Sequence, residues 1–236
     1  MDYHREFLTN PAAHGLVIEN FIASDGTPCL VCAPNPSGNF GDRGTKIRQQ
    51  LTARGLDLTK SSPIIGTLVL VHGRKGRKED YLPIAERLCA SGFRCVIPDL
   101  PAHGDHPADT ATYGVRECGL PARILNESAR KFAFHPQPAG LIGMSMGGSV
   151  AMHATDLSDA PWKALVVISS FDSFPAVIEG QATRHIGSTF GPLWSAGSDF
   201  VYRGKTGMHL SNIQPHVHAT ANFLLLLLAK AYRCHG

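Results

Sequence analysis

The sequence predicts an α/β protein, built as a three-layer α/β/α sandwich around a mostly parallel sheet. The first observation is an alternation of short apolar runs with segments in which apolar residues recur at helical spacing. The second is that the runs are apolar at successive positions, as in strands that helices cover on both faces. The length of 236 residues suits a single domain with a full-sized core.

The chain is expected to begin with a β-hairpin. Residues 15–33 indicate two strands joined by a turn at Asp25 and Gly26. Residues 34–63 are rich in Pro, Gly, Asn, Ser and charged residues, which indicates an insertion or long surface loop with a short helix near Lys46–Gly55.

Strands and helices then alternate. Strands are expected at 66–73, 93–100, 139–144 and 163–171, and helices at 78–92, 112–132 and 146–157. Right-handed crossovers would place the carboxyl ends of these strands, and the loops that follow them, along one edge of the sheet.

Bulk composition argues against several classes of function. The net charge is only +3 and no block of like charges stands out, so neither nucleic acid nor a membrane surface is an expected partner. The N-terminus lacks the apolar core of a signal peptide, and the longest apolar run, Phe223–Ala229, is too short to span a bilayer. A soluble, cytoplasmic protein is expected.

Cys29 and Cys32 form a C-x-x-C pair inside an expected strand. Residues three apart on a strand point to opposite faces, so a redox or metal pair is not expected here. Buried free thiols are the better interpretation.

A serine between glycines marks the end of one strand and the start of a helix. Gly143-Met144-Ser145-Met146-Gly147 has the form G-x-S-x-G. In so tight a turn the central residue takes strained backbone angles, and the residues two before and two after it must be small. The hydroxyl would stand above the sheet edge, beside N–H groups that favour a developing negative charge. Ser145 is therefore the candidate nucleophile.

An oxyanion hole needs two N–H donors aimed at one point. One would be the N–H of Met146, and the other the N–H of Arg74 in the loop after the strand "TLVLV". His72 is expected to organise this loop rather than to act as a base. In "PDLPAHGDHP", a metal site could be suggested by His103, Asp105 and His106. No fourth ligand is suitably spaced to join them, so neither a metal nor a cofactor is predicted.

Four segments occur in the order "VLVHGRKG", "PDLPAHGDHP", "TYGVRE" and "GLIGMSMGGSVAMHA". With them the chain resembles the α/β-hydrolase family, in particular its bacterial carboxylesterase, monoacylglycerol-lipase-like and serine-aminopeptidase-like members. The resemblance runs from about residue 15 to at least residue 171. It implies Ser145 as nucleophile, the N–H groups of Arg74 and Met146 as oxyanion donors, and one α/β-hydrolase domain over residues 1–236 that lacks the last strand.

The acid and the base of the triad do not follow the family's pattern, in which they come after the serine in the order Asp or Glu, then His. No Asp or Glu occurs after Asp199. The chain could be incomplete at its C-terminus, could use a rearranged triad, or could be a non-catalytic binding relative. A rearranged triad would combine Asp172 with His216, His218 or His235. An incomplete sheet would also leave an exposed edge, through which self-association is expected.

Residues 173–212 are expected to form a lid, because few strand signals and several aromatic residues occur there. The aromatic residues could line an acyl pocket or fill a small core of the lid itself. The predicted function is hydrolysis of a carboxylic ester, less readily an amide, through an acyl-enzyme on Ser145. The substrate would be a small-molecule ester or lipid-like, and an acyltransferase using the same serine is an alternative.

Overall fold

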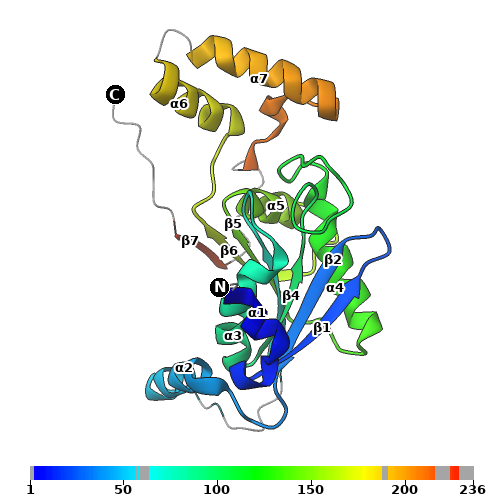
Figure 1. Ribbon diagram of the computed structural model, residues 1–236, viewed down its shortest axis with the longest axis vertical. Helices are drawn as coiled ribbons and strands as arrows, with labels where there is room; N and C mark the ends of the chain where they lie inside the picture. Colours follow the sequence, from blue (N-terminus) through cyan, green and yellow to red (C-terminus); the bar gives the residue numbers. More distant parts are fainter. Residues whose placement is uncertain (1–2, 57, 59–63, 188–190, 216–223, 229–236) are drawn as a thin grey trace.

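The computed structural model describes residues 3–56, 58, 64–187, 191–215 and 224–228. Figure 1 shows one sheet with helices on both faces and two further helices above one of its edges. The described strands form a single sheet in the order β1-β2-β4-β3-β5-β6-β7. The predicted three-layer α/β/α arrangement is thereby confirmed.

The sheet is antiparallel at one side and parallel over the rest. β1 (Leu16–Ile22) and β2 (Pro28–Pro34) form the expected hairpin, and β2 also pairs antiparallel with β4 (Phe93–Pro98). The remaining neighbours pair in parallel. These parallel strands are β3 (Gly66–Val71), β5 (Ala139–Met144), β6 (Trp162–Ile168) and β7 (Leu224–Leu228). Their carboxyl ends therefore share one edge of the sheet.

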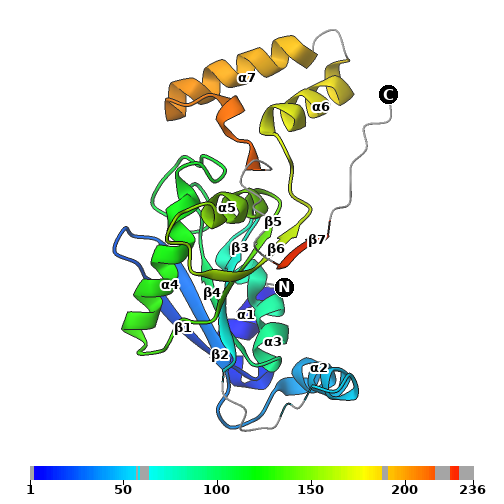
Figure 2. The same cartoon turned by 180° about the vertical axis from the view of Figure 1, so that it is seen from behind.

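Helices cover both faces of the sheet (Figure 2), and each face carries its own hydrophobic core. Helices α4 (Leu120–Lys131) and α5 (Met146–Thr155) pack on one face, and α1 (Tyr3–Thr9) and α3 (Leu82–Ala90) pack on the other. Cys29 belongs to the first core and Cys32 to the second, so the two thiols face apart as expected. Both are free and buried, and burial raises the pKa of each thiol.

Helix α1 was not expected from the sequence. The fully buried Phe7 of this helix stacks on the ring of His14 with the ring centroids 3.9 Å apart. His14 ends the short 3₁₀ helix η1 (Pro11–His14). Because α1 has only seven residues, its sequence is too short to show a helical period.

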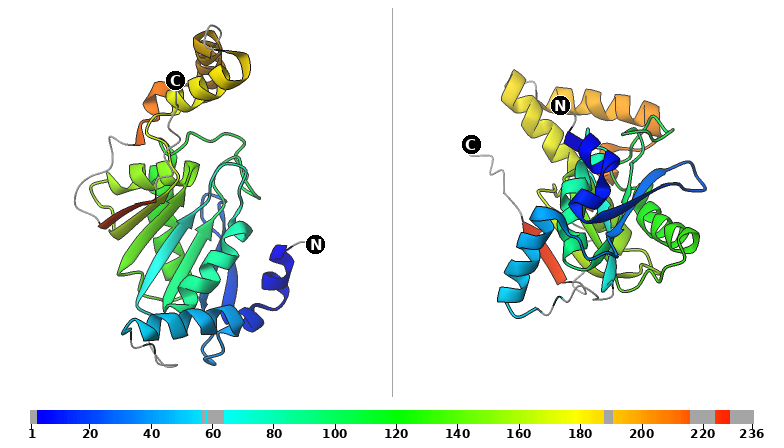
Figure 3. Two further views of the ribbon diagram at one scale, coloured as in Figure 1. Left: turned by 90° about the vertical axis from the view of Figure 1, so that its left-hand side faces the viewer. Right: turned by 60° about the horizontal axis from the view of Figure 1, so that its bottom comes forward.

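Within the expected insertion at 34–63, the structure places α2 (Gly41–Ala53), which packs against α3. α2 lies at the end of the molecule opposite to α6 (Phe174–Ile186) and α7 (Gly191–Thr206), as Figure 3 shows. The insertion is therefore far from the sheet edge that carries the candidate site.

The helix expected over 112–132 begins later than predicted. After the 3₁₀ helix η3 (Glu117–Gly119), α4 starts only at Leu120. The buried Glu117 carboxylate accepts hydrogen bonds from the N–H of Thr112 (2.6 Å) and of Gly114 (2.9 Å), which close a loop instead. Tyr113 and Gly114 have φ values of 55° and 113°, which a helix does not allow. The segment is mostly helical, as predicted, but the prediction was wrong over residues 112–116 for this reason.

Residues 173–212 form α6, α7 and the 3₁₀ helix η4 (Leu210–Asn212). α6 and α7 pack on each other and lie above the edge at which the parallel strands end (Figures 1 and 3). Across the described part of the chain, every helix is too short or too polar to cross a membrane.

Candidate active site

Ser145 stands between β5 and α5 at backbone angles of φ 54° and ψ −116°. These angles are rare for a residue with a side chain and cost free energy, so the surroundings must enforce them. The N–H of Ser145 donates to the carbonyl of Ile168 in β6 (2.9 Å). Its carbonyl accepts from the N–H of Gly148 (2.9 Å) and from the hydroxyl of Ser170 (3.0 Å). The half-buried serine is thus held by both β6 and α5.

The glycines around Ser145 are required by close backbone contacts. A Cβ at Gly143 would lie 2.1 Å from the carbonyl oxygen of Gly147, and a Cβ at Gly147 would lie 2.1 Å from that of Val71. Both distances are far below van der Waals contact. The expectation that positions 143 and 147 must be small is therefore confirmed.

The loop after β3 lies against the serine. A Cβ at Gly73 would be 3.4 Å from the Cβ of Ser145, so the next residue, Arg74, follows directly beside the turn. Met146 is the first residue of α5, and its side chain is buried. Among the described residues, none accepts a hydrogen bond from the N–H of Arg74 or of Met146. Both groups are therefore available to a ligand, and their role as oxyanion donors stays a prediction.

His72 organises the loop after β3, as the sequence analysis expected. Its Nε2 accepts a hydrogen bond from the N–H of Leu100 (3.0 Å), so the proton is on Nδ1, which donates to the carbonyl of Gly73 (2.9 Å). The side chain is fully buried, and this burial lowers its pKa. A neutral His72 therefore joins the loop after β3 to the loop after β4.

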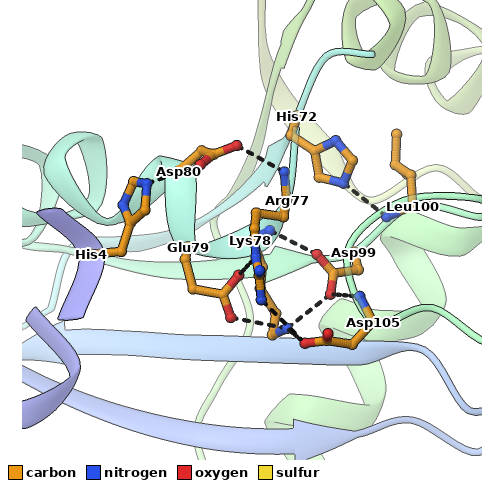
Figure 4. A network of polar contacts seen from close by, with 9 residues as sticks. All are labelled: His4, His72, Arg77, Lys78, Glu79, Asp80, Asp99, Leu100 and Asp105. Atoms are coloured by element: carbon orange, nitrogen blue, oxygen red, sulfur yellow. Dashed lines mark hydrogen bonds and ion pairs between the residues drawn. The ribbon is translucent and has the colours of Figure 1, made fainter. Parts of the chain in front are cut away.

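A buried ionic network joins the same two loops (Figure 4). Lys78, in the 3₁₀ helix η2 (Lys78–Tyr81), places its Nζ 2.8 Å from Asp99, 2.7 Å from Asp105 and 3.0 Å from Glu79. Asp99 is fully buried and also accepts from the N–H of Lys78 (2.7 Å) and of Asp105 (2.9 Å). Burial opposes the charge of Lys78, but the three carboxylates outweigh it and raise the pKa of this ammonium group.

The network leaves no room for a side chain at Gly104, whose φ is 55° and whose Cβ would lie 2.2 Å from Asp99 Oδ1. The loop after β4 is therefore folded tightly around the Asp99 carboxylate. This network was not predicted from the sequence. The one available signal was an acidic residue, Asp99, near the end of the apolar strand expected at 93–100.

The three side chains considered as metal ligands have other partners. His103 Nδ1 lies 2.8 Å from the carbonyl of Pro101, and His106 Nε2 lies 3.2 Å from the hydroxyl of Thr27. Asp105 binds Lys78, which lowers the pKa of its carboxyl group. Within the described ranges, no three or more His, Cys, Asp or Glu side chains are grouped so that they could hold a metal ion.

A cavity of about 1170 Å³ extends from Ser145 to the two helices above the sheet edge. Tyr113, from the loop after β4, also lines it, and its ring lies 4.1 Å from that of Phe174. Most of the other lining residues are apolar: Met146, Phe171, Phe174, Val177, Ile178, Ile186, Leu193, Trp194 and Val201. A substrate with an apolar part could thus reach the serine hydroxyl.

The structure does not identify an acid or a base. Asp172 is exposed before α6, and its Oδ1 accepts a hydrogen bond from the N–H of Ser173 (2.7 Å). The alternative bases lie outside the described residues: His216, His218 and His235. His153 is buried in α5, and His185 is exposed on α6. Among the described residues that line the cavity, none is a histidine or a carboxylate.

The alpha/beta hydrolase family matches residues 68–229 of this chain. No curated protein sequence matches it. Among solved structures, the acylaminoacyl peptidase of Pyrococcus horikoshii superposes with a TM-score of 0.57 and 14% identity, covering 96% of this chain and 33% of that one. An esterase from Pyrococcus furiosus gives 0.50 and 15% over 78% and 66% of the two chains. A thermostable carboxyl esterase from Bacillus coagulans gives 0.50 and 14% over 81% and 52%. This chain thus spans from about a third to two thirds of the length of these relatives, and the likeness is one of fold.

We expect Gly147→Ala to destabilise the protein by about 3 kcal/mol or more, because the new methyl group would collide with the backbone of β3. Gly204→Ala in α7 is the matched control, since a Cβ there meets nothing within 4 Å. It should stabilise the protein by about 0.5–1 kcal/mol through helix propensity. Urea unfolding of both variants measures the difference. Equal stability of Gly147→Ala and the unmodified protein would contradict the tight crossing.

We expect Asp99→Ala to lower the free energy of unfolding by about 3–5 kcal/mol, because it leaves Lys78 buried with an incomplete set of partners. Asp159→Ala, in an exposed turn, should change it by less than about 0.5 kcal/mol. Thermal and urea unfolding at neutral pH compare the two. A loss below about 1 kcal/mol in Asp99→Ala would show that the network does not hold the two loops.

Proposed function

This chain belongs to the alpha/beta hydrolase family, and we propose that it is a serine hydrolase that cleaves a carboxylic ester, and less readily an amide. The observation that carries the proposal is Ser145, held at a positive φ between β5 and α5 and open to a large apolar cavity. A residue keeps so costly a conformation only where the surrounding structure enforces it, and such strain is concentrated at functional sites.

In the proposed reaction, Ser145 Oγ attacks the carbonyl carbon of the ester while a base removes its proton. The carbonyl oxygen becomes an oxyanion that the N–H groups of Arg74 and Met146 stabilise. The alcohol leaves with the proton, and an acyl group stays on Ser145. Water then attacks the acyl-enzyme in the same way and releases the acid. The reaction needs no metal ion and no cofactor.

For the acid and the base we propose Asp172 with one of three histidines, namely His216, His218 or His235. Asp172 is suited to be the acid because it follows the carboxyl end of β6, at the sheet edge that carries Ser145. The base has to come within hydrogen-bond reach of Ser145 Oγ, because a serine hydroxyl is a weak nucleophile without one.

We expect Ser145→Ala to abolish labelling by a fluorophosphonate probe and to lower the hydrolysis of p-nitrophenyl esters by about 10³-fold or more. Ser158→Ala, in an exposed turn, is the matched control and should keep both activities. Labelling and turnover are measured on samples with equal thermal unfolding profiles.

Three outcomes distinguish the alternatives. Absence of labelling in the folded, unmodified protein would contradict the proposal and favour a non-catalytic binding protein. Labelling at a residue other than Ser145 would contradict the assigned nucleophile. Labelling at Ser145 with acyl transfer to an added alcohol or thiol in preference to water would make the protein an acyltransferase.

A second series identifies the base. One of His216→Ala, His218→Ala and His235→Ala should lower kcat by about 10³-fold or more, and Asp172→Asn should have a smaller effect of the same sign. His185→Ala, exposed on α6, serves as the control and should leave kcat unchanged. If none of the three histidine variants loses activity, the rearranged triad is wrong.

A further inference from the structure

A second, smaller cavity of about 360 Å³ adjoins the large one. The two cavities share four lining residues: Arg74, Tyr113, Tyr202 and Lys205. Most residues that line the small cavity are uncharged, as in the large one, but three of them are cationic, and two of these cations also line the large cavity. A molecule bound at Ser145 could therefore extend past these cations into the small cavity.

Three cations, Arg74, Lys75 and Lys205, line the small cavity, and Arg74 and Lys205 also line the large one. Among the described residues, no carboxylate forms an ion pair with any of them. The positive charge of Arg74 lies near the Tyr113 hydroxyl and acts against the rise in its pKa that burial causes. Asp109 is the one carboxylate among the described residues that line the small cavity, so the balance of fixed charges there is positive.

Three other acidic residues of this region already bind cations. Asp99, Asp105 and Glu79 all bind Lys78 inside the ionic network, and Glu79 and Asp105 also bind Arg77. Arg74, Lys75 and Lys205 therefore have no ion-pair partner among the described residues, and an anionic group of a ligand would supply one.

We propose that the substrate is an amphiphilic ester whose apolar part occupies the large cavity and whose anionic group, a carboxylate or a phosphate, occupies the small basic one. This inference rests on the proposed function and names the substrate class of the same site. Arg74 and Lys75 come from the loop after β3, whereas Lys205 comes from α7. The anionic group would therefore join the sheet edge to the helices above it.

The expected effect is moderate because the three cations are exposed to solvent. Exposed ion pairs of this kind strengthen binding by about two- to fivefold each, and salt weakens them. Together the cations should favour an anionic ligand over a neutral one by about tenfold at low ionic strength.

Binding to the Ser145→Ala protein tests the proposal without any turnover. Fluorescence of Trp194, which lines the large cavity, reports titration with N-octanoylglycine, with its neutral analogue N-octanoylglycinamide, and with octyl phosphate. We expect at least one anionic ligand to bind about tenfold more tightly than the neutral one, and 0.5 M NaCl to remove most of this preference. The stronger of the two anionic ligands identifies a carboxylate or a phosphate as the preferred group.

The charge variant is Lys75→Met combined with Lys205→Met, and the matched control is Lys131→Met on the exposed side of α4. The double variant should reduce the preference to about twofold or less, and the control should keep it. Equal affinities for charged and neutral ligands, or an unchanged preference in the double variant, would overturn the proposal.

Turnover then separates this proposal from the proposed function. The substrates are 4-(octanoyloxy)benzoate and the neutral 4-(octanoyloxy)benzamide, and the quantity compared is the ratio of their kcat/KM values in each variant. That ratio should fall in the double variant and not in Lys131→Met. Preferential binding of anions by a protein that the fluorophosphonate does not label would contradict the hydrolase and leave the anionic ligand class standing.

Discussion

The structure of the site depends on one steric constraint, the crossing of β3, β5 and α5 at a distance that excludes side chains. Neither Gly143 nor Gly147 could carry a Cβ without meeting a backbone carbonyl at 2.1 Å. The chain can then pass from strand to helix only through a sharp turn, and Ser145 takes the positive φ of that turn. The same crossing brings the loop after β3 against the serine and leaves the first N–H groups of α5 beside its hydroxyl. The exposure of the Ser145 hydroxyl and the availability of the N–H donors thus both follow from the close packing of β3, β5 and α5.

The buried ionic network around Lys78 positions the loop after β4. Removing Lys78 and Asp99 from water is costly, and the pair is tolerated because further hydrogen bonds satisfy both groups. Its effect is geometric, because it fixes the loop after β4 against the residues that follow β3. It also separates the charges of the region, since the Asp99 and Glu79 carboxylates are buried beside Lys78 while Arg74 and Lys75 remain at the surface. The basic side of the cavity therefore results from the same arrangement that stabilises its floor.

The sequence predicted those features that local pattern determines. Apolar runs located the strands, and the G-x-S-x-G spacing located the turn at Ser145, because both depend on neighbours within a few residues. The helix boundary near residue 120 was missed, because the Glu117 carboxylate binds backbone N–H groups of Thr112 and Gly114 and stabilises a loop where residue spacing favoured a helix. That Lys205 and Arg74 line the same cavities could not be predicted either. The two residues are far apart in sequence, and only the placement of α7 above the sheet edge brings them to one cavity.

The two sides of the large cavity, its floor around Ser145 and its roof formed by α6 and α7, differ in how tightly they are packed. The floor consists of backbone turns and buried groups around Ser145 whose positions are fixed several times over, so a substitution there disturbs the fold as well as the site. The roof consists of α6 and α7, which pack mainly on each other and present exposed apolar side chains, such as Leu193 and Trp194, to the cavity. One polar contact between the two parts is the hydrogen bond that the Arg116 guanidinium donates to the Thr206 carbonyl (2.6 Å). Substitutions in the roof can therefore change the shape and charge of the cavity while the serine turn keeps its geometry, so that ligand choice can vary independently of the chemistry.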